Sequence, residues 1–484
     1  MESYKLLIGK DWIEAASGEW ITVHNPATSE PVGRVPKAGR GEADQALRTA
    51  AQAFKEWSVR PAAERCELLR RATATVREHS EEIARILTLE QGKPLGQARA
   101  EVKGALETLD YFAEVGKRIL GEILPTESRE RLSFVVWQPV GVVAAIVPWN
   151  YPVNLLCWKL GPALVSGCTV VAKPASQTPI SALVLARYLL EGGLTPGVFN
   201  VVTGSGSTVG QELIDSPLSH KVSFTGSTEM GKLVMSSAAA HLKKVGLELG
   251  GSSPLVVLKD ADIAEAVKGG VLKAFKNSGQ ICNSINRIYV ERPLYDEYVD
   301  RFTKATARLT VGDGLKDPDV DLGPLIDEAA RTRVREHVED AVARGARLCH
   351  GGKAPEGAQF KNGFYFEPTV LADVNHEMRV MREETFGPIA PIMAVNDFED
   401  AIARANDSPF GLVGYLYTTS LANAIEASRR MDCGSIGVND TSFSGGPYPY
   451  PAWKESGTGV ELSHHGLREF MHIKHIRVRV PARA

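Results

Sequence analysis

The feature that most constrains this chain is a regular alternation of apolar runs and helical stretches, which begins near residue 140. Parallel strands that are buried on both faces appear in a sequence as short, nearly continuous apolar runs. Such runs predict strands at 142–147, 169–172, 198–202, 222–224 and 244–249. Helical periodicity between them predicts helices at 153–166, 180–191, 208–214 and 229–240. Strands that alternate with helices in this way predict a doubly wound α/β domain.

The flanking regions extend this pattern. After residue 252 we expect a second α/β domain, with strands at 255–258 and 286–291 and helices at 263–276 and 294–308. Ahead of residue 120, periodic apolar residues predict helices that cover one face of a sheet, at 42–57, 62–89 and 98–119.

Two segments far apart in the chain have the alternating pattern of a strand with one apolar face. The first, at 128–137, alternates at Leu132, Phe134 and Val136. The second, at the end of the chain, alternates at Ile476, Val478 and Val480. Because an unpaired strand edge invites pairing, we expect the tail strand to pair with 128–137 or with another subunit.

Composition excludes several classes of protein. The 484 residues suffice for two or three domains, and a chain of this size buries about 75% of its unfolded surface. A net charge of −3 gives no field that would attract nucleic acid or an anionic membrane. The longest apolar run, 140–147, is too short to span a bilayer, and the N-terminus lacks the apolar region of a signal peptide.

The six cysteines are scattered and form no CxxC pair, which argues against a disulfide scaffold or a zinc site. We therefore expect a cytoplasmic protein. His464-His465 lacks further ligands nearby in the sequence, so no metal site is expected.

Three residues have side chains suited to chemistry at a carbonyl carbon. Cys282, in Gly279-Gln280-Ile281-Cys282-Asn283, is a candidate nucleophile. Glu248, at the end of an apolar strand, is a candidate general base, and Asn150 is a candidate oxyanion donor. Taken singly, each has an ordinary alternative: a core cysteine, a turn carboxylate and a helix N-cap.

Two further features suggest a phosphate or nucleotide ligand. Thr225-Gly226-Ser227 follows a strand and opens a helix, where backbone N–H groups can bind a phosphate. The segment lacks the first glycine of the GxGxxG fingerprint, so a tight βα turn is the alternative. Lys173 ends a strand at the edge where ligands bind in such sheets, although, taken alone, it is more typical of a solvated lysine before a turn.

Together these residues resemble the aldehyde dehydrogenase superfamily over nearly the whole chain. The matching segments are Pro148-Trp149-Asn150, Lys173-Pro174, Phe224-Thr225-Gly226-Ser227-Thr228, Glu248-Leu249-Gly250-Gly251, Gly279-Gln280-Ile281-Cys282, Gly323-Pro324-Leu325-Ile326, Glu367-Pro368-Thr369-Val370, Glu383-Glu384-Thr385-Phe386-Gly387-Pro388 and Lys454-Glu455-Ser456-Gly457. The resemblance implies a dinucleotide-binding domain (1–120 and 140–251), a catalytic domain (252–454) and a small β oligomerisation arm (121–139 and 455–484). It also implies a homodimer or homotetramer.

The resemblance implies oxidation of an aldehyde to the carboxylic acid with NAD or NADP. The Cys282 thiolate attacks the aldehyde carbon, while Asn150 and the Cys282 backbone N–H hold the oxyanion. Hydride then leaves to the nicotinamide, and Glu248 activates the water that hydrolyses the thioester. Because Glu248 is present, a coenzyme-A-acylating member is disfavoured. Because Cys282, Glu248 and Asn150 all remain, a catalytically silent binding protein on this fold is also disfavoured.

By the same resemblance, Lys173 and Glu384 hold the cofactor riboses and Phe386 packs beside the nicotinamide. Further cofactor contacts are expected from Ile146, Pro148, Trp149, Ser176, Gly206, Phe224, Thr225, Gly226, Ser227 and Leu249. Many NAD-preferring members have a glutamate where this chain has Ser176. A carboxylate there would repel a 2′-phosphate and serine would not, so both NAD and NADP stay open.

The expected substrate pocket contains Trp158, Ile281 and Tyr448. Succinate-semialdehyde dehydrogenases usually have an arginine at the position of Trp158. An aromatic wall suits an apolar or cationic tail. The segment 446–453 departs from the usual family pattern as well. The expected substrate is a small aliphatic aldehyde or semialdehyde, with succinate semialdehyde and betaine aldehyde as alternatives.

Overall fold

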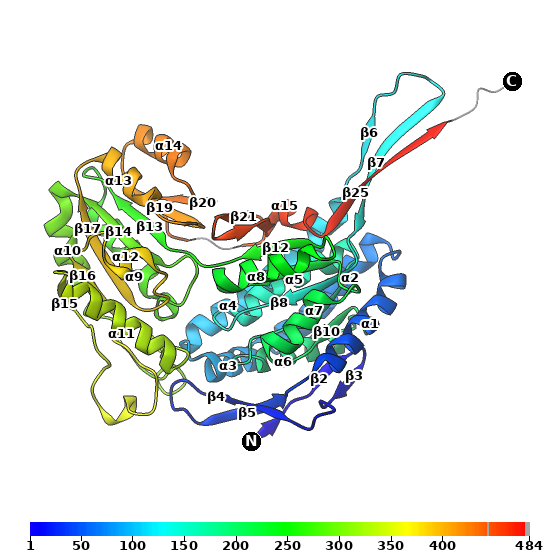
Figure 1. The fold of residues 1–484 in the computed structure, drawn as a ribbon, viewed down its shortest axis with the longest axis horizontal. Helices are drawn as coiled ribbons and strands as arrows, with labels where there is room; N and C mark the ends of the chain where they lie inside the picture. The colour runs from blue at the N-terminus through cyan, green and yellow to red at the C-terminus, as the bar shows by residue number, and fades with distance from the viewer. Residues whose placement is uncertain (443–444, 480–484) are drawn as a thin grey trace.

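A computed structural model describes residues 1–442 and 445–479, which form two α/β lobes and a projecting β arm (Figure 1). The larger lobe is built on an eight-stranded sheet with the order β23-β12-β11-β8-β9-β10-β2-β3. The strands from β12 to β10 are parallel, which confirms the doubly wound sheet. Their bounds are β12 Lys244–Glu248, β11 Lys221–Thr225, β8 Val142–Ile146, β9 Thr169–Lys173 and β10 Phe199–Val201. The flanking strands are β23 Gly457–Thr458, β2 Leu6–Ile8 and β3 Asp11–Ile13.

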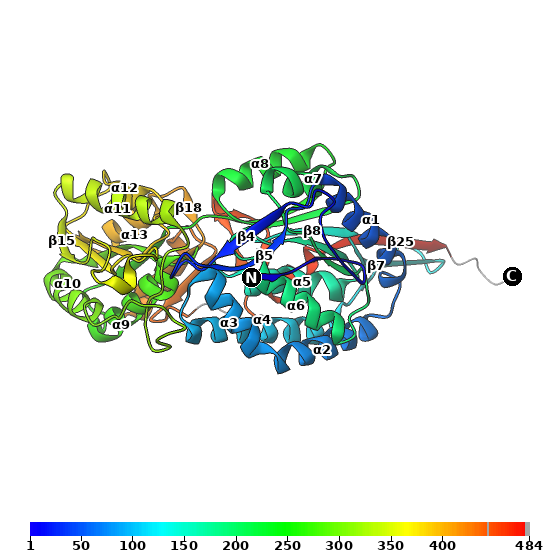
Figure 2. The same ribbon diagram turned by 90° about the horizontal axis from the view of Figure 1, so that it is seen from below.

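Helices cover both faces of this sheet, as Figure 2 shows from below. Alternate residues of β8 explain why: Val142 and Ala144 pack in one hydrophobic cluster, and Val143 and Ala145 pack in another. The first cluster is covered by α1 (Arg40–Trp57), α7 (Gln211–Asp215, after the π-helical turn η2 Gly206–Gly210) and α8 (Thr228–Ala239). The second is covered by α5 (Pro152–Ser166), α6 (Ile180–Glu191), α2 (Ala62–Glu78), α3 (Ser80–Gln91) and α4 (Leu95–Val115, followed by η1 Gly116–Arg118).

The helix predicted over 62–89 is wrong in one respect, because the structure divides it at His79. This residue has φ −109° and ψ 15°, outside the helical region, and its carbonyl accepts the first bond of α3 from Ile83 N–H. Its ring stacks on Tyr188 of α6 with the centroids 3.9 Å apart. A tertiary contact therefore coincides with a break that local periodicity did not reveal. The predicted end at Gly92 is correct, since Gly92 is left-handed (φ 91°).

The second lobe confirms the second α/β unit. Its seven-stranded sheet has the order β15-β16-β17-β14-β13-β19-β20, and all neighbours are parallel except β15 and β16. The strands are β15 Arg347–His350, β16 Thr369–Ala372, β17 Ile389–Val395, β14 Ile285–Glu291, β13 Ser253–Val257, β19 Val413–Tyr417 and β20 Ser435–Val438. The helices are α9 Ile263–Phe275, α10 Arg292–Thr306, α11 Glu328–Ala343, α12 Arg379–Arg382, α13 Phe398–Asn406 and α14 Leu421–Arg430, with η3 Lys276–Gly279 and η4 Ala358–Phe360.

The arm consists of β25 (Met471–Arg479), β7 (Arg131–Pro139) and β6 (Glu122–Leu124) in antiparallel order. Ile476 lies opposite Phe134. The predicted pairing of the tail with 128–137 is therefore confirmed, and Val480 lies outside the described residues. Figure 1 shows this arm projecting from the larger lobe.

The C-terminal segment joins the two lobes. β22 (Trp453–Lys454) pairs with β18 (Phe410–Gly411) of the second lobe, and β23 pairs with β12 of the first. Beside them, β21 (Tyr450–Pro451) pairs with β24 (Val460–Glu461), and α15 (Ser463–Arg468) leads into β25. At the N-terminus, β1 (Glu2–Ser3), β5 (Pro31–Pro36) and β4 (Trp20–His24) form a small separate sheet.

Candidate active site

The predicted site residues gather at the carboxyl ends of the parallel strands of the larger lobe. The register places Ile146 beside both Lys173 and Phe224, and Thr225 beside Glu248. Residues that are up to about a hundred positions apart in the sequence therefore share one edge of the sheet. This edge is where ligands bind in open α/β sheets.

Asn150 lies in the turn between β8 and α5 and reaches the loop that precedes Cys282. Its side-chain Nδ2 donates to the carbonyl of Gln280 at 3.0 Å, and its Oδ1 has no hydrogen-bond partner among the described residues. The amide is buried beside the cysteine loop, so its second N–H can serve a substrate oxygen.

A buried ion pair that the sequence did not reveal holds this turn in place. Lys93 Nζ donates to Glu101 at 2.5 Å and to the carbonyl of Asn150 at 2.6 Å, and it lies 3.7 Å from the centroid of the Tyr151 ring. Glu101 in turn accepts from the backbone N–H of Val153 at 3.0 Å, in the first turn of α5. The pair thus links α4, the Asn150 turn and α5.

The segment before Cys282 has a left-handed backbone. Asn277, Ser278 and Gly279 have φ values of 51°, 55° and 72°. A Cβ on Gly279 would overlap the carbonyl of Gly387, so only glycine fits there. Ser278 Oγ donates to the carbonyl of Gly323 at 2.7 Å. Strained backbone of this kind persists only where the surroundings fix it, and it is concentrated at functional sites.

The Cys282 thiol is neutral in this arrangement. Burial raises its pKa to about 12, and the carboxyl groups of Glu248 and Glu384 add to the rise. The Tyr450 hydroxyl, 3.7 Å from Sγ, and Lys273 act in the opposite direction. Formation of a thiolate therefore requires added positive charge or a base in the site.

Glu248 ends β12 with only 4% of its surface exposed, and neither carboxylate oxygen has a hydrogen-bond partner among the described residues. Burial raises its pKa well above the usual value, and Glu461 adds to the rise while Lys159 opposes it. Lys159 Nζ donates to Glu461 at 2.5 Å and to Thr225 Oγ1 at 2.7 Å. A buried carboxyl group with a raised pKa is suited to general-base catalysis.

Around Lys173 the site presents groups that suit a nucleotide. The Lys173 amine is buried, and among the described residues its one hydrogen bond is to the carbonyl of Pro174 at 3.1 Å; burial lowers its pKa to about 8. Ser176 Oγ donates to the carbonyl of Gly204 at 3.4 Å, close to Gly206 in the π-helical turn. A buried amine without an anionic partner fits a ligand that brings hydroxyl or phosphate oxygens.

The second part of the expected cofactor site lies at the start of α8. Ser227 caps this helix by accepting from the N–H of Met230 at 3.3 Å, and Leu249 packs where a Cβ on Gly231 would collide with it. A Cβ on Gly226 would likewise collide with the ring of Phe224, so the turn is closely packed.

Glu384 and Phe386 approach from the second lobe. Glu384 Oε1 accepts from the N–H of Gly251 at 2.9 Å, and burial raises its pKa to about 7. Phe386 meets Trp149 edge to face, with the ring centroids 5.5 Å apart, and Pro148 lies next to Trp149. The two lobes therefore both contribute residues to this region.

On the other side of Cys282 the walls are aromatic. Trp158 and Tyr450 meet edge to face at 5.3 Å, and Trp158 Nε1 donates to Asn154 Oδ1 at 3.1 Å. Ile281 is buried beside the cysteine. The structure does not bring the predicted Tyr448 into this wall, because its side chain is 66% exposed. The sequence did not single out Tyr450, which lies two residues after Tyr448. Only its position in a strand distinguishes it from Tyr448.

Two observations concern metal binding and membrane insertion. Residues 1–442 and 445–479 contain no cluster of three or more His, Cys, Asp or Glu side chains arranged to hold a metal ion. Within the same residues, every helix is too short or too polar to cross a membrane.

Comparison with known proteins agrees with this geometry. The family model described as the aldehyde dehydrogenase family matches residues 12–476. The chain belongs to the aldehyde dehydrogenase family. This aldehyde dehydrogenase oxidises an aldehyde to the carboxylic acid and uses NAD or NADP.

Three similar proteins illustrate the range of this family. The chain is 44% identical to an Escherichia coli succinate-semialdehyde dehydrogenase [NADP(+)], over 97% of this chain and 96% of the relative. It is 43% identical to a Pseudomonas aeruginosa glutarate-semialdehyde dehydrogenase, over 96% and 95%. The crystal structure of a Staphylococcus aureus betaine aldehyde dehydrogenase in complex with NAD+ superposes with a TM-score of 0.96 at 32% identity, covering 100% and 96% of the two chains.

Proposed function

We propose that this aldehyde dehydrogenase acts on a short aliphatic semialdehyde, whose far end carries an anionic group. The observation that supports this proposal is Lys273 on α9. Its side chain is 8% exposed, and its amine makes no hydrogen bond or ion pair with the described residues. A buried cation without an anionic partner is costly unless a ligand supplies the opposite charge.

The surroundings of Lys273 link it to the loop that carries Cys282. Its amine lies 5.9 Å from the centroid of the Tyr415 ring, and the Tyr415 hydroxyl donates to the carbonyl of Asn283, next to Cys282. Burial and the charge of Lys276 lower the pKa of Lys273 to about 7, whereas Cys282 raises it. A bound carboxylate or sulfonate would raise this pKa and secure the ammonium form.

The relatives support the same class, since two of those named above act on succinate or glutarate semialdehyde. The residues proposed to carry the reaction are Cys282 as nucleophile, Asn150 with the Cys282 backbone N–H as oxyanion donors, and Glu248 as general base for hydrolysis of the thioester. The bound cofactor supplies the oxidised nicotinamide that accepts hydride. Trp158, Tyr450 and Ile281 exclude water around the reacting carbon.

Binding of the cofactor is proposed to use Lys173, Ser176 and Gly206 at one end and Glu384, Phe386 and Trp149 at the other. The larger lobe (1–120 and 140–251) is then the dinucleotide-binding domain and 252–454 the catalytic domain. Because Ser176 leaves room for a 2′-phosphate, we propose that NADP is accepted. Replacing Ser176 with Glu should shift the NADP/NAD ratio of kcat/KM at least tenfold toward NAD, and an unchanged ratio would remove this argument.

Betaine aldehyde is the second candidate, because the aromatic pair of Trp158 and Tyr450 suits a cationic tail. The decisive experiment compares succinate semialdehyde, glutarate semialdehyde, butanal and betaine aldehyde in the intact enzyme and in Lys273→Met. For the semialdehydes the variant should raise KM at least tenfold and leave kcat within about twofold. For butanal both constants should be unchanged. An equal loss on all substrates, or a preference for betaine aldehyde, would reject the anionic tail.

A direct test of the nucleophile uses Cys282→Ser. This variant should bind the reduced cofactor as the unaltered enzyme does but lose dehydrogenation, because a serine hydroxyl is a far weaker nucleophile than a thiolate. Retained oxidation would assign the chemistry to another residue.

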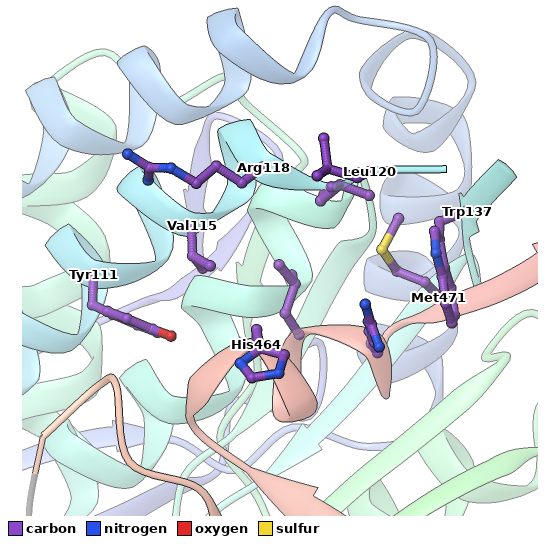
Figure 3. A pocket seen from close by; sticks show the side chains of 10 residues that line it. Tyr111, Val115, Arg118, Leu120, Trp137, His464 and Met471 are labelled. Atoms are coloured by element: carbon purple, nitrogen blue, oxygen red, sulfur yellow. The ribbon is translucent and has the colours of Figure 1, made fainter. Parts of the chain in front are cut away.

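We also propose that the arm (121–139 and 455–484) joins copies of this chain into a homodimer or homotetramer. Exposed apolar residues on the arm support this: Ile123, Leu132, Ile473 and Val478. A cavity of about 280 Å³ at the base of the arm is lined in part by Leu120, Trp137 and Met471 (Figure 3). Exposed apolar surface of this extent is typical of a protein interface.

A further inference from the structure

A row of polar side chains lies along one face of the sheet. It begins at Glu248, the proposed general base, and extends away from it. Alternate residues of β11 share a face, and these are Lys221, Ser223 and Thr225. In the register with β12, Ser223 lies opposite Gly246, and Thr225 lies opposite Glu248. The row therefore leads from Glu248 at the carboxyl end of the sheet back to Lys221 at the start of β11.

A small cavity lies along this row. Its volume is about 10 Å³, enough for about one water molecule, and its lining includes Lys221, Ser223, Glu248, Thr458, Glu461 and Glu469. Four buried polar atoms of these side chains have no hydrogen-bond partner among the described residues: both carboxylate oxygens of Glu248, Oε2 of Glu461 and Nζ of Lys221. Buried polar atoms of this kind are normally satisfied, and a water in the cavity can donate to two of the carboxylate oxygens while it accepts from Lys221 Nζ.

Gly246 creates the space for this water. A Cβ at this position would lie 3.3 Å from Lys221 Nζ, tighter than an ordinary contact, so any larger side chain would fill the cavity. The backbone of Gly246 does not have a positive φ, and the strand itself therefore does not require glycine. The need for space is an independent reason for glycine here.

The far end of the row opens to solvent. Lys221 is only 1% exposed, but its Nζ lies 3.9 Å from Oε2 of Glu469, whose side chain is 35% exposed. The charged groups that act on Lys221 are Glu469, Glu461, Lys244 and Lys159. Burial, partly offset by the two carboxylates, lowers the pKa of Lys221 to about 8, so its amine can both accept and release a proton near neutral pH.

Hydrolysis of the thioester requires a route by which a proton can leave Glu248 for solvent. If Glu248 is the general base, as proposed above, each turnover leaves a proton on a carboxyl group that is 4% exposed. We propose that a water in this cavity, Lys221 and Glu469 carry that proton from Glu248 to solvent.

The chemical steps balance without an added reactant. Water forms a C–O bond to the acyl carbon, one of its O–H bonds breaks and passes the proton to Glu248, and the C–S bond breaks to release the Cys282 thiolate. Glu248 then gives its proton to the cavity water, which passes one of its own to the neutral amine of Lys221. The resulting ammonium group releases a proton to Glu469, which passes it to solvent. Lys221 acts through Glu248 and does not touch the substrate.

The test separates the first turnover from later ones in Lys221→Met and Gly246→Ala. Gly246→Ala keeps every charge and removes only the space for water. Rapid mixing with aldehyde and cofactor should give reduced nicotinamide in the first turnover at the unaltered rate. The steady-state rate should then fall at least tenfold, and intact-protein mass spectrometry should show acylated Cys282 accumulating. Lys244→Met is the control, because its Nζ bonds to the Met471 carbonyl at 2.7 Å; its steady-state rate should stay within about twofold.

Several other outcomes would overturn the proposed proton route. Normal hydrolysis in both variants, or a loss in Lys221→Met alone, would overturn the route. If Lys221→Met fails to fold, as judged by circular dichroism, Gly246→Ala and Glu469→Gln decide the question, since both must slow hydrolysis. Glu248→Gln distinguishes the two proposals: it must trap the acyl-enzyme if Glu248 is the base, whether or not Lys221 carries its proton.

Discussion

Single residues hold the Asn150 turn in place. The Lys93–Glu101 pair is fully buried, and Lys93 also holds the carbonyl of Asn150. Because removal of one partner leaves an unpaired buried charge, Lys93→Met should cost about 3–5 kcal/mol in the free energy of unfolding. Urea unfolding followed by circular dichroism measures this loss, and kcat should fall with it as Asn150 loses its support.

The matched control for this change is Lys103→Met, on α4. Lys103 is 78% exposed and lies 3.8 Å from Glu107, so its loss should cost less than about 0.5 kcal/mol. Equal destabilisation by the two changes would show that the buried pair has no special role.

Glu384 illustrates a conflict between stability and binding at one residue. Its pKa is raised from 4.5 to about 7 in the folded protein, so its contribution to stability is fully present below pH 4.5 and is lost as the pH rises through 7. Glu384→Gln keeps the acceptor for Gly251 N–H and removes the buried charge. We expect the variant to equal the unaltered enzyme at pH 4.5 and to be more stable by about 1–3 kcal/mol at pH 8.

The same variant should bind the cofactor at least tenfold more weakly, because a neutral amide accepts hydrogen bonds less strongly than a carboxylate. Urea unfolding at the two pH values and cofactor titration test both parts. A stability difference that does not grow with pH would contradict the raised pKa.

The backbone conformation of the loop before Cys282 depends on one residue, Gly279. Gly279 has φ 72° and lies against the carbonyl of Gly387. Gly279→Ala should therefore displace Cys282 and lower kcat/KM at least about 100-fold, since misplacement by 1 Å is enough for such a loss. Steady-state kinetics gives the readout.

Gly96→Ala serves as the control for that change. Gly96 lies in α4 with a helical backbone, and no atom lies within 4 Å of an added Cβ. Alanine should stabilise the helix by about 0.5–1 kcal/mol and leave kinetics unchanged. If both glycine changes had the same effect, the strained loop would not be the cause.

The elements that the sequence predicts well are those whose signal is local. The buried strands β8, β9 and β11 are apolar runs, and Gly92 ends α3 as expected. The break at His79 depends on stacking against Tyr188, which is 109 positions away, and no local pattern encodes it. Lys93 and Tyr450 join the site through contacts across elements, so their type and spacing alone could not reveal them.

At the scale of the molecule, the proposed role of the arm in association can be tested by one substitution. Ile473 is 63% exposed on β25 and lies opposite Trp137. Ile473→Lys would place a charge in an apolar interface, and we expect the mass measured by light scattering to fall toward that of a single chain of 52.4 kDa.

Leu421→Lys is the matched change on α14, far from the arm, where leucine is 74% exposed. It should leave the mass unchanged. An unchanged mass for Ile473→Lys would place the association elsewhere, for instance on the exposed Met230 and Leu233 of α8.

The way the C-terminal segment joins the two lobes also sets the order of events during synthesis. Cys282 leaves the ribosome long before Tyr450, Glu461 and β25 exist. Until those residues are made, β7 has β6 on one side but lacks β25 on the other, β12 lacks β23, and the Tyr450 hydroxyl is not yet beside the cysteine. A chain cut before Tyr450 therefore lacks both the hydroxyl beside Cys282 and the β25 edge of the arm.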